Sequence, residues 1–342
     1  MTFINKQWVL TRRPDGKLTP DNFEWREAPC PELKDGEILV RNIYLSLDPT
    51  NRLWTNEEDS YLPAVAIGDV MRGYGVGIVE QSRHANFSNG DVVTGALNWQ
   101  SHPVIAGDSG DAFLIQAEPG VPLTAYQGLF GAIGITAYFG LMDIGQPKAG
   151  ETLVVSAAAG AVGSIVGQIG KKEGCRVVGI AGNDEKCRWL TESLGFDAAI
   201  NYKTNNIAEA LKEHCPNGID IYFDNVGGEM LNTALLHINH GARIPLCGMI
   251  STYNDKENQP GPSNIDKLLI KSAKLQGFIV IDYLDRAEEA MAYLGAAYAA
   301  GDIQYRVHLV EGLEKAPESL GMLFTGGNNG KLIVKIDPDW AE

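Results

Sequence analysis

The pattern of apolar and polar residues changes near residue 150. Before that point, short runs of β-branched and aliphatic residues alternate with turn residues, and strands are predicted at 37–47, 75–80 and 91–94. Glycine adopts the positive φ that a tight turn needs, so turns are predicted at Asp15-Gly16, Asp35-Gly36 and Asn89-Gly90. The pattern predicts a β-rich domain in the form of a partly closed barrel.

From Gly150 onward, apolar runs alternate with helical segments, which is typical of a parallel sheet. Strands are predicted at 151–156, 176–181, 197–202, 220–227, 242–248 and 274–280, the number of a complete Rossmann sheet. A helix is predicted over 283–300, and further strands at 307–310 and 331–336. Because a β pattern lies on both sides, we expect an α/β chain with a Rossmann domain of residues 126–301 inserted in a domain of residues 1–125 and 302–342.

The first βα turn of the Rossmann unit carries a motif of small residues. Thr152 to Val155 suits a strand that is buried on both faces, and a helix follows it directly. A pyrophosphate can rest on this helix N-terminus if the backbone there is closely approachable, at Gly160, Ala161, Val162 and Gly163. Ala158 occupies the first glycine position of the usual fingerprint, so an ordinary small-residue turn is the alternative on the motif alone.

Charge and cysteine content exclude several classes of partner. The formal net charge of -15 repels phosphate groups, so neither nucleic acid nor an anionic membrane surface is expected as a partner. Five scattered cysteines and an N-terminus without an apolar leader indicate reduced thiols in a cytoplasmic protein. Residues 119–142 lack charge but contain prolines and glycines, so we expect a buried helix joining two domains rather than a membrane span.

Motifs spread over most of the chain resemble one family. They are Tyr44 to Pro49, Ala157 to Gly163, Gly195 to Asp197, Asn201 to Lys203, Tyr222 to Gly228, Cys247-Gly248, Ser251 to Asn254 and Pro260 to Pro262. The chain thereby resembles the zinc-independent medium-chain dehydrogenase/reductases, in the prostaglandin reductase (leukotriene B4 dehydrogenase) branch. Leu141 to Pro147 and Asp282-Tyr283 resemble the bacterial NADPH-dependent curcumin reductases of that branch. The resemblance implies a GroES-like barrel domain, an inserted Rossmann domain and a cleft between them.

The chain departs from the family at Thr50 and Asn51, where relatives typically have Tyr-Met. This segment is expected to border the substrate cleft. A zinc alcohol dehydrogenase of the wider superfamily needs Cys and His ligands and a G-H-E motif, where this chain has Gly73-Tyr74-Gly75. His84 and His102 have no ligand-spaced partners, so no metal site is predicted.

The resemblance implies NADPH as the cofactor. An NAD enzyme usually presents an acid at the end of the second strand, whereas this chain has Ala181-Gly182-Asn183. Lys186 and Tyr202 are the expected ligands of the 2′-phosphate; a solvated lysine is the alternative for Lys186, and Asp184 keeps NAD as an alternative cofactor. The resemblance also places around the nicotinamide half Asn225, Cys247, Gly248, Ser251, Tyr253, Phe278, Val280 and Asn328. For Phe278 and Val280, packing within a core strand is the alternative.

Without a metal to polarise a carbonyl group, hydride exchange with a conjugated double bond is favoured. The resemblance implies that NADPH delivers hydride to the β-carbon of an α,β-unsaturated carbonyl compound, such as a curcumin-like diarylheptanoid, an enone or an enal. A hydroxyl donor then stabilises the enolate. The catalytic candidates are Tyr253, just beyond the fifth strand, and Tyr61, on a loop that the family places near the substrate carbonyl. A tyrosine that only packs is the alternative for each.

Two other functions stay open. One is an NADPH quinone reductase of the same superfamily, and the other is a reductase-like protein that binds NADPH without turnover. The strand at 275–280 would form a sheet edge, which proteins tend to pair or protect. Because family members pair at this edge, a homodimer is expected.

Overall fold

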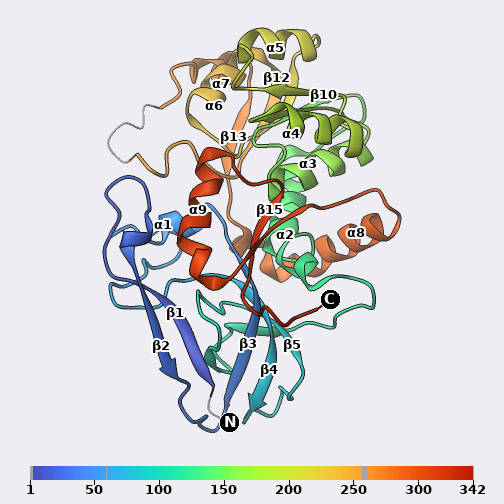
Figure 1. Ribbon diagram of the computed structural model, residues 1–342. Coiled ribbons are helices and arrows are strands. Elements are labelled where there is room, and N and C mark those ends of the chain that lie inside the picture. The colour runs from blue at the N-terminus through green and yellow to red at the C-terminus, as the bar shows by residue number, and fades with distance from the viewer. Residues whose placement is uncertain (1–2, 59, 256–260, 342) are drawn as a thin grey trace. The chain divides into compact units, whose positions relative to one another are not determined.

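The computed structural model describes residues 3–58, 60–255 and 261–341. The chain forms two compact units, of which the first comprises Met1–Gln127 and Val307–Glu342 and the second comprises Gly128–Arg306. Each unit has a sheet of its own (Figure 1). This arrangement confirms the predicted fold class, an α/β chain with a Rossmann sheet and a separate β-rich domain.

The second unit is built on a parallel sheet with the strand order β10-β9-β8-β11-β12-β13. Its strands are β8 (Thr152–Val155), β9 (Arg176–Ala181), β10 (Ala198–Asn201), β11 (Ile219–Phe223), β12 (Ile238–Leu246) and β13 (Lys274–Gly277). This is the doubly wound order, in which the strand order reverses beside β8. The carboxyl end of β8 is therefore the expected place for a dinucleotide.

Helices cover both faces of this sheet (Figure 1). Side chains alternate along β8, so Leu153 and Val155 pack with the α3 residue Ile165, while Val154 packs with the α5 residue Leu211 on the opposite face. The helices are α2 (Ala132–Phe139), α3 (Ala161–Lys172), α4 (Asp184–Arg188), α5 (Ile207–His214), α6 (Gly228–Ala234), α7 (Asp266–Ile270) and α8 (Ala287–Ala299). Burial on both faces explains why the central strand β8 is almost entirely apolar.

Two predicted strands of this sheet are too long. The prediction at 220–227 is wrong beyond Phe223, because the Asp224 carboxylate accepts the backbone N–H groups of Val226 and Gly227 at 3.0 and 3.1 Å and turns the chain. The prediction at 274–280 is wrong beyond Gly277, since Val280–Arg286 forms a 3-10 helix that precedes α8. The helix predicted over 283–300 accordingly starts at Ala287.

The charge-free segment 119–142 is interrupted rather than being one helix. It contains a 3-10 turn at Leu123–Gln127, then α2, then a π-helical turn at Gly140–Gly145. Glycine lowers helix propensity by about 1 kcal/mol relative to alanine, and Gly128 and Gly131 lie between the first two elements. Across the ranges described, no helix has the length and apolar content to cross a membrane.

The first unit contains a sheet with the strand order β14-β15-β3-β4-β5-β7, and β6 pairs with β3 as well. Its strands are β3 (Glu37–Ser46), β4 (Gly75–Ser82), β5 (Val92–Gly95), β6 (Val104–Ala106), β7 (Ala112–Leu114), β14 (Val307–Glu311) and β15 (Lys331–Lys335). A hairpin of β1 (Ile4–Leu10) and β2 (Phe23–Pro29), and helices α1 (Thr50–Leu53) and α9 (Ala316–Thr325), complete the unit. Trp54 and Trp99 are buried in its largest apolar cluster, and the partly buried Trp8 and Trp25 pack against it.

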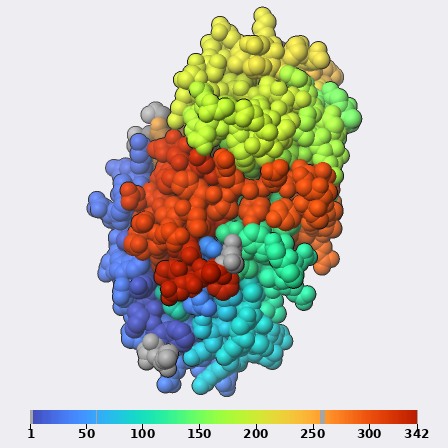
Figure 2. All heavy atoms as spheres, turned by 45° about the vertical axis from the view of Figure 1, so that its right-hand side comes forward, coloured from blue at the N-terminus to red at the C-terminus, as the bar shows by residue number. Residues whose placement is uncertain are grey.

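Both ends of the chain contribute to this first unit. Strand β15 runs antiparallel to β3, with Lys335 opposite Tyr44. In Figure 2 the C-terminal residues, in dark red, lie against the blue and cyan surface of the N-terminal strands. The pairing brings Lys331, the first residue of β15, beside the end of β3.

Candidate active site

The turn after β8 forms a cradle of backbone atoms at the start of α3. Gly160 caps the helix in an extended conformation, and Ala161, Val162 and Gly163 form its first turn. A Cβ atom at Gly163 would lie 2.6 Å from the Ala157 carbonyl oxygen and 2.8 Å from the Ala158 Cα. Only glycine allows this contact between helix and turn. N–H groups in the first turn of a helix have no intrahelical acceptors, so this cradle fits a pyrophosphate.

In this turn, the residue with the backbone conformation that favours glycine is Ala157 rather than Ala158. Ala157 has φ of 48°, in the left-handed region that favours glycine. Ala158 is fully buried, and its N–H donates to the Ile180 carbonyl of β9 at 2.9 Å. The incomplete fingerprint therefore still forms the tight turn, at the expense of backbone strain at Ala157.

The tip of β9 brings together three residues that suit a phosphate. Lys186 is 7% exposed, and burial, followed by the nearby charge of Lys203, lowers its pKa. A Cβ at Gly182 would lie 3.2 Å from the Tyr202 ring and 3.6 Å from the Lys203 Cε, so Gly182 leaves room for both side chains. Two lysines and a tyrosine hydroxyl converge at the position where an NAD enzyme presents an acid.

The sequence predicted neither the contact that Asp184 makes nor the position of Lys203 beside Lys186. The Asp184 carboxylate accepts a hydrogen bond from the Asn201 side chain at 2.6 Å, which ties this acid to the end of β10. Lys203 was not predicted as a ligand, although it directly follows Tyr202. Only the three-dimensional structure identifies it. The charge of Lys203, which follows β10, lowers the pKa of Lys186, which follows β9.

A buried carboxylate organises the loops after β11 and β12. Asp224 is fully buried, which raises its pKa, and it accepts hydrogen bonds from the Ser156 hydroxyl at 2.9 Å and the Tyr222 hydroxyl at 3.2 Å. The Asp224 backbone oxygen accepts the N–H groups of Cys247 and Gly248 at 2.9 and 3.1 Å. Sequence reasoning missed Asp224, whose role depends on contacts between three separate strand ends.

Asn225 and Ser251 line the same loops with fixed side chains. Asn225 donates from its amide to the Ser156 carbonyl at 2.8 Å, and its backbone N–H donates to the Ser156 hydroxyl at 2.8 Å. The Ser251 hydroxyl donates to the Val226 carbonyl at 2.6 Å. These bonds hold the carboxyl ends of β8 and β11 in one arrangement.

Tyr253 presents an oriented hydroxyl at this edge of the sheet. Its oxygen accepts the Met249 N–H at 3.1 Å, and a Cβ at Gly248 would lie 3.3 Å from that oxygen. Burial raises the pKa of the phenol, so it stays protonated at neutral pH. Because the oxygen already accepts a bond, the hydroxyl proton is the group that Tyr253 offers to a ligand.

Three other candidates near this edge have different surroundings. Burial, followed by the charge of Asp224, raises the pKa of the Cys247 thiol to about 12, so it is not a nucleophile at neutral pH. The Phe278 ring packs edge-on to Phe223, and a Cβ at Gly140 would lie 2.4 Å from it. Phe278 therefore has a core contact, and Val280 starts a 3-10 helix rather than ending a strand.

Tyr61 and Asn328 belong to the first unit. Tyr61 is 40% exposed, and its hydroxyl shares a hydrogen bond with the Thr50 hydroxyl. Asn328 is buried and donates from its amide to the Gly330 carbonyl at 2.8 Å. The residues predicted for the cofactor thus divide between the units, with all except Asn328 in the second.

Comparisons with known proteins identify the family. Two family models match, one described as the N-terminal domain of oxidoreductase over residues 6–112 and one as zinc-binding dehydrogenase over residues 161–295. NADPH-dependent curcumin reductase of Escherichia coli (strain K12) is 44% identical over 98% of this chain and 98% of its own. The chain belongs to the zinc-independent medium-chain dehydrogenase/reductase family.

Other members of this family cover the chain equally well. Prostaglandin reductase 1 of Bos taurus is 42% identical over 96% of this chain and 98% of its own. The crystal structure of CurA from Vibrio vulnificus in complex with NADPH has a TM-score of 0.92 and 46% identity, covering 97% of this chain and 99% of that one. The structure of Escherichia coli quinone oxidoreductase is 19% identical, with a TM-score of 0.76, and shows the shared fold alone.

The two histidines that were considered as metal ligands, His84 and His102, make protein contacts. His84 Nε2 lies 3.0 Å from an Asp108 carboxylate oxygen, and His102 Nδ1 lies 3.0 Å from the Ser101 hydroxyl. Burial lowers the pKa of His102. Among the described residues, no group of three or more His, Cys, Asp or Glu side chains is placed to hold a metal ion.

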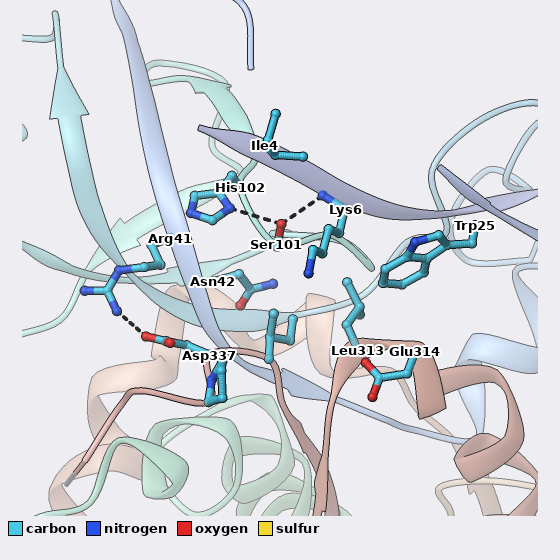
Figure 3. Close-up of a pocket in the computed structure, with 12 residues that line it drawn as sticks. Ile4, Lys6, Trp25, Arg41, Asn42, Ser101, His102, Leu313, Glu314 and Asp337 are labelled. Carbon is cyan, nitrogen blue, oxygen red and sulfur yellow. Dashed lines mark hydrogen bonds and ion pairs between the residues drawn. The ribbon is translucent and has the colours of Figure 1, made fainter. Parts of the chain in front are cut away.

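A cavity of about 170 Å³ in the first unit contains none of the predicted site residues (Figure 3). Its wall includes Lys6, Arg41, His102 and Glu314, with Asp337 paired to Arg41. The charged groups of this wall come from both ends of the chain. The cavity is therefore a feature of the first unit's packing and is separate from the candidate residues described above.

Proposed function

We propose that this protein is an NADPH-dependent reductase of the conjugated C=C bond in α,β-unsaturated carbonyl compounds. Family membership supports the reaction class, because relatives along the whole chain are named as curcumin reductase and prostaglandin reductase. The observation that carries the proposal is the Tyr253 hydroxyl, which is protonated and oriented by Met249 at the carboxyl edge of the sheet. Such a donor suits the oxyanion that forms when a conjugated carbonyl is reduced.

The chain's own residues account for the choice of cofactor. The cradle at Gly160 to Gly163 would hold the pyrophosphate, and Lys186, Lys203 and Tyr202 would hold the 2′-phosphate. Asn225, Cys247, Gly248, Ser251, Tyr253, Phe278, Val280 and Asn328 are proposed around the nicotinamide half. NADPH supplies the hydride when it is bound. The Asp184 carboxylate accepts a hydrogen bond from Asn201, and this contact makes Asp184 a weaker candidate for binding the ribose of NAD.

The role of Tyr253 is argued from its protonation and contacts, and that of Tyr61 from the family resemblance. Hydride addition to the β-carbon of an enone places negative charge on the carbonyl oxygen, and a neutral phenol stabilises this enolate by donating a hydrogen bond. Tyr253 is proposed for that donation, alone or with a ribose hydroxyl of the cofactor. Tyr61 is proposed as a second contact to the substrate carbonyl. The proposed substrates are enones, enals and curcumin-like diarylheptanoids.

A homodimer through the edge of the second unit is part of the proposal. Strand β13 ends the sheet order, and the nearby helix α7 has no buried residue among those described. Leu269 is 84% exposed and Ile270 is 61% exposed, and an apolar edge of this kind tends to be paired. Light scattering should give a dimer for the wild type and a monomer for Leu269→Lys combined with Ile270→Lys. A wild-type monomer would remove this part of the proposal.

The proposed location is the cytoplasm, which the five free cysteines support. Substrate class is tested by NADPH oxidation with a panel of enones, enals, diarylheptanoids and quinones. We expect turnover with the conjugated carbonyl compounds and none without an acceptor. Turnover with quinones alone would favour the quinone reductase, and tight NADPH binding without any turnover would favour the non-catalytic alternative.

A further inference from the structure

The turn that leads from β8 to the backbone cradle contains one residue in an unfavourable conformation. Ala157 has φ of 48°, where the Cβ of any residue except glycine crowds the following carbonyl oxygen. The Ala157 carbonyl accepts the Gly160 N–H at 2.9 Å, and a Cβ at Gly163 would lie 2.6 Å from its oxygen. The conformation of Ala157 therefore shapes the start of α3, where the pyrophosphate is proposed to bind.

Ser156, which directly precedes Ala157, is held by hydrogen bonds to the end of β11. Its backbone N–H donates to the Phe223 carbonyl at 3.1 Å, and its hydroxyl donates to an Asp224 carboxylate oxygen at 2.9 Å. The hydroxyl oxygen accepts the Asn225 N–H at 2.8 Å, and the Ser156 carbonyl accepts the Asn225 amide at 2.8 Å. The backbone and the side chain of Ser156 are thus both fixed to β11.

The Asp224 carboxylate, which accepts the Ser156 hydroxyl, is held in place by other donors. The Val226 and Gly227 N–H groups donate to it at 3.0 and 3.1 Å, and the Tyr222 hydroxyl donates to it at 3.2 Å. Asp224 is fully buried, so movement of its carboxylate would leave these donors without an acceptor, at a cost in stability. The acceptor of the Ser156 hydroxyl is therefore fixed.

Ala158 holds the other side of the turn. It is fully buried, and its N–H donates to the Ile180 carbonyl of β9 at 2.9 Å. Strands β9 and β11 are the two neighbours of β8 in the sheet. Ala157 thus lies between one residue that is bonded to β11 and another that is bonded to β9. A residue in a sparsely populated conformation persists where its surroundings determine it in this way.

We infer that Ser156 is a positioning residue for cofactor binding, which holds Ala157 in the left-handed conformation through the bonds of its hydroxyl to Asp224 and Asn225. Glycine adopts a positive φ without strain, so a glycine at position 157 would need no such restraint. Ser156 acts through Ala157 and needs no contact with the cofactor. The inference rests on the proposed function in one respect, namely that the NADPH pyrophosphate binds at the turn after β8.

The test measures NADPH binding by calorimetry for Ser156→Ala, Ala157→Gly and the double variant. The left-handed conformation disfavours residues other than glycine by a factor of about 5 to 30, so Ser156→Ala should weaken NADPH binding about 5- to 30-fold. In the Ala157→Gly background, Ser156→Ala should change NADPH affinity by less than about threefold, because the strain that Ser156 restrains is then absent.

Two controls separate this positioning role from a general loss of structure. Ser164→Ala removes another buried serine hydroxyl, which donates to the Ala161 carbonyl within α3 at 3.2 Å, and should leave NADPH affinity unchanged. Adenosine 2′-monophosphate carries the 2′-phosphate but no pyrophosphate, so wild type and Ser156→Ala should bind it equally well. Equal losses of affinity for NADPH and for adenosine 2′-monophosphate would show a damaged fold and overturn the inference.

The dependence on residue 157 decides the role of Ser156. NADPH affinity at the wild-type level in Ser156→Ala, or a loss that stays the same when residue 157 is glycine, would overturn the inference. If Ser156→Ala does not fold, Ala157→Gly is compared with the double variant, and a difference above about threefold contradicts it. If wild type binds no NADPH, the proposed function fails. If wild type and Ser156→Ala bind NADPH equally well, only the role of Ser156 fails.

Discussion

The candidate residues of the two units are held in different ways. In the second unit, the cradle at Gly163 is made of backbone atoms, and the loops beyond it are fixed by the buried Asp224. In the first unit, Tyr61 is 40% exposed, and its hydroxyl shares a hydrogen bond with the Thr50 hydroxyl. The comparison shows that the cradle at Gly163 depends on backbone shape, whereas the arrangement at Tyr61 depends on individual side chains. Substitutions in the two regions should therefore have different consequences.

The largest effect is expected for Gly163→Ala. The new Cβ would lie 2.6 Å from the Ala157 oxygen, and backbone cannot yield as a flexible side chain does. Overpacking costs about 1 to 3 kcal/mol, so the free energy of unfolding should fall by that amount, and NADPH affinity should fall about 100-fold or more. Urea unfolding and calorimetric titration measure the two quantities.

Gly295→Ala in α8 is the matched control, because a Cβ there meets nothing within 4 Å. It should raise the free energy of unfolding by about 0.5 to 1 kcal/mol and leave NADPH affinity unchanged. Equal behaviour of the two variants would show that the turn tolerates a side chain and that the backbone cradle is not essential.

The next largest effect is expected for Lys186→Ala, which should weaken the binding of NADPH but not that of NADH. A hydrogen bond to a charged group contributes about 1.5 to 3 kcal/mol, so NADPH binding should weaken about 10- to 150-fold, with NADH binding little changed. Lys203→Ala should act in the same direction with a smaller effect, since Lys203 is more exposed. Lys212→Ala on α5 is the control. Equal losses for NADPH and NADH would contradict the assignment of the 2′-phosphate site.

Tyr253→Phe tests the chemical step in the second unit. A donor aimed at an oxyanion contributes on the order of 10² to 10³ in kcat, and sharing the role with a ribose hydroxyl should reduce the loss to about 10- to 100-fold. Stability and NADPH affinity should change little. Tyr293→Phe, which removes a hydroxyl that donates to Glu173, is the control. Stopped-flow hydride transfer at the wild-type rate in Tyr253→Phe would assign the role to Tyr61 or to water.

The smallest effect is expected for Ala157→Gly. Ala157 has φ of 48°, and glycine would relieve this left-handed strain, which stabilises the fold by about 1 to 2 kcal/mol. Glycine also gives the unfolded chain more conformational entropy, which destabilises the fold by about 0.5 to 1 kcal/mol. The free energy of unfolding should therefore rise by about 1 kcal/mol or less, and NADPH affinity should stay within about threefold. A large loss of affinity would mean that the alanine side chain itself contributes to the site.

The elements of the Rossmann sheet and its first turn could be predicted from the sequence, because the patterns that indicate them are local. Strand and helix periods, the glycines at 160 and 163 and the uncharged tip of β9 are visible within short windows. The turn at Ala157 was missed because the motif pointed to Ala158. The order of the strands followed from the Rossmann pattern, and the overlong predictions at 220–227 and 274–280 failed where side-chain contacts override the apolar run.

The side-chain networks could not be read from the sequence. Asp224 connects three strand ends, the charge of Lys203 acts on Lys186 from the turn after β10, and Lys331 forms an ion pair with Asp48 from 283 positions away. Each depends on pairings of distant segments that no local window contains. The contact of Thr50 with Tyr61 is of the same kind.

The position of a transferred deuterium tests the proposed reaction. The enzyme would be given NADPH carrying deuterium at the transferable C4 position together with an enone, and the product would be examined by NMR and mass spectrometry. The account predicts a saturated ketone with one deuterium on the former β-carbon, with no NADPH consumed when the enone is left out. Deuterium on the carbonyl carbon of an alcohol product, or unchanged enone beside bound NADPH, would contradict it.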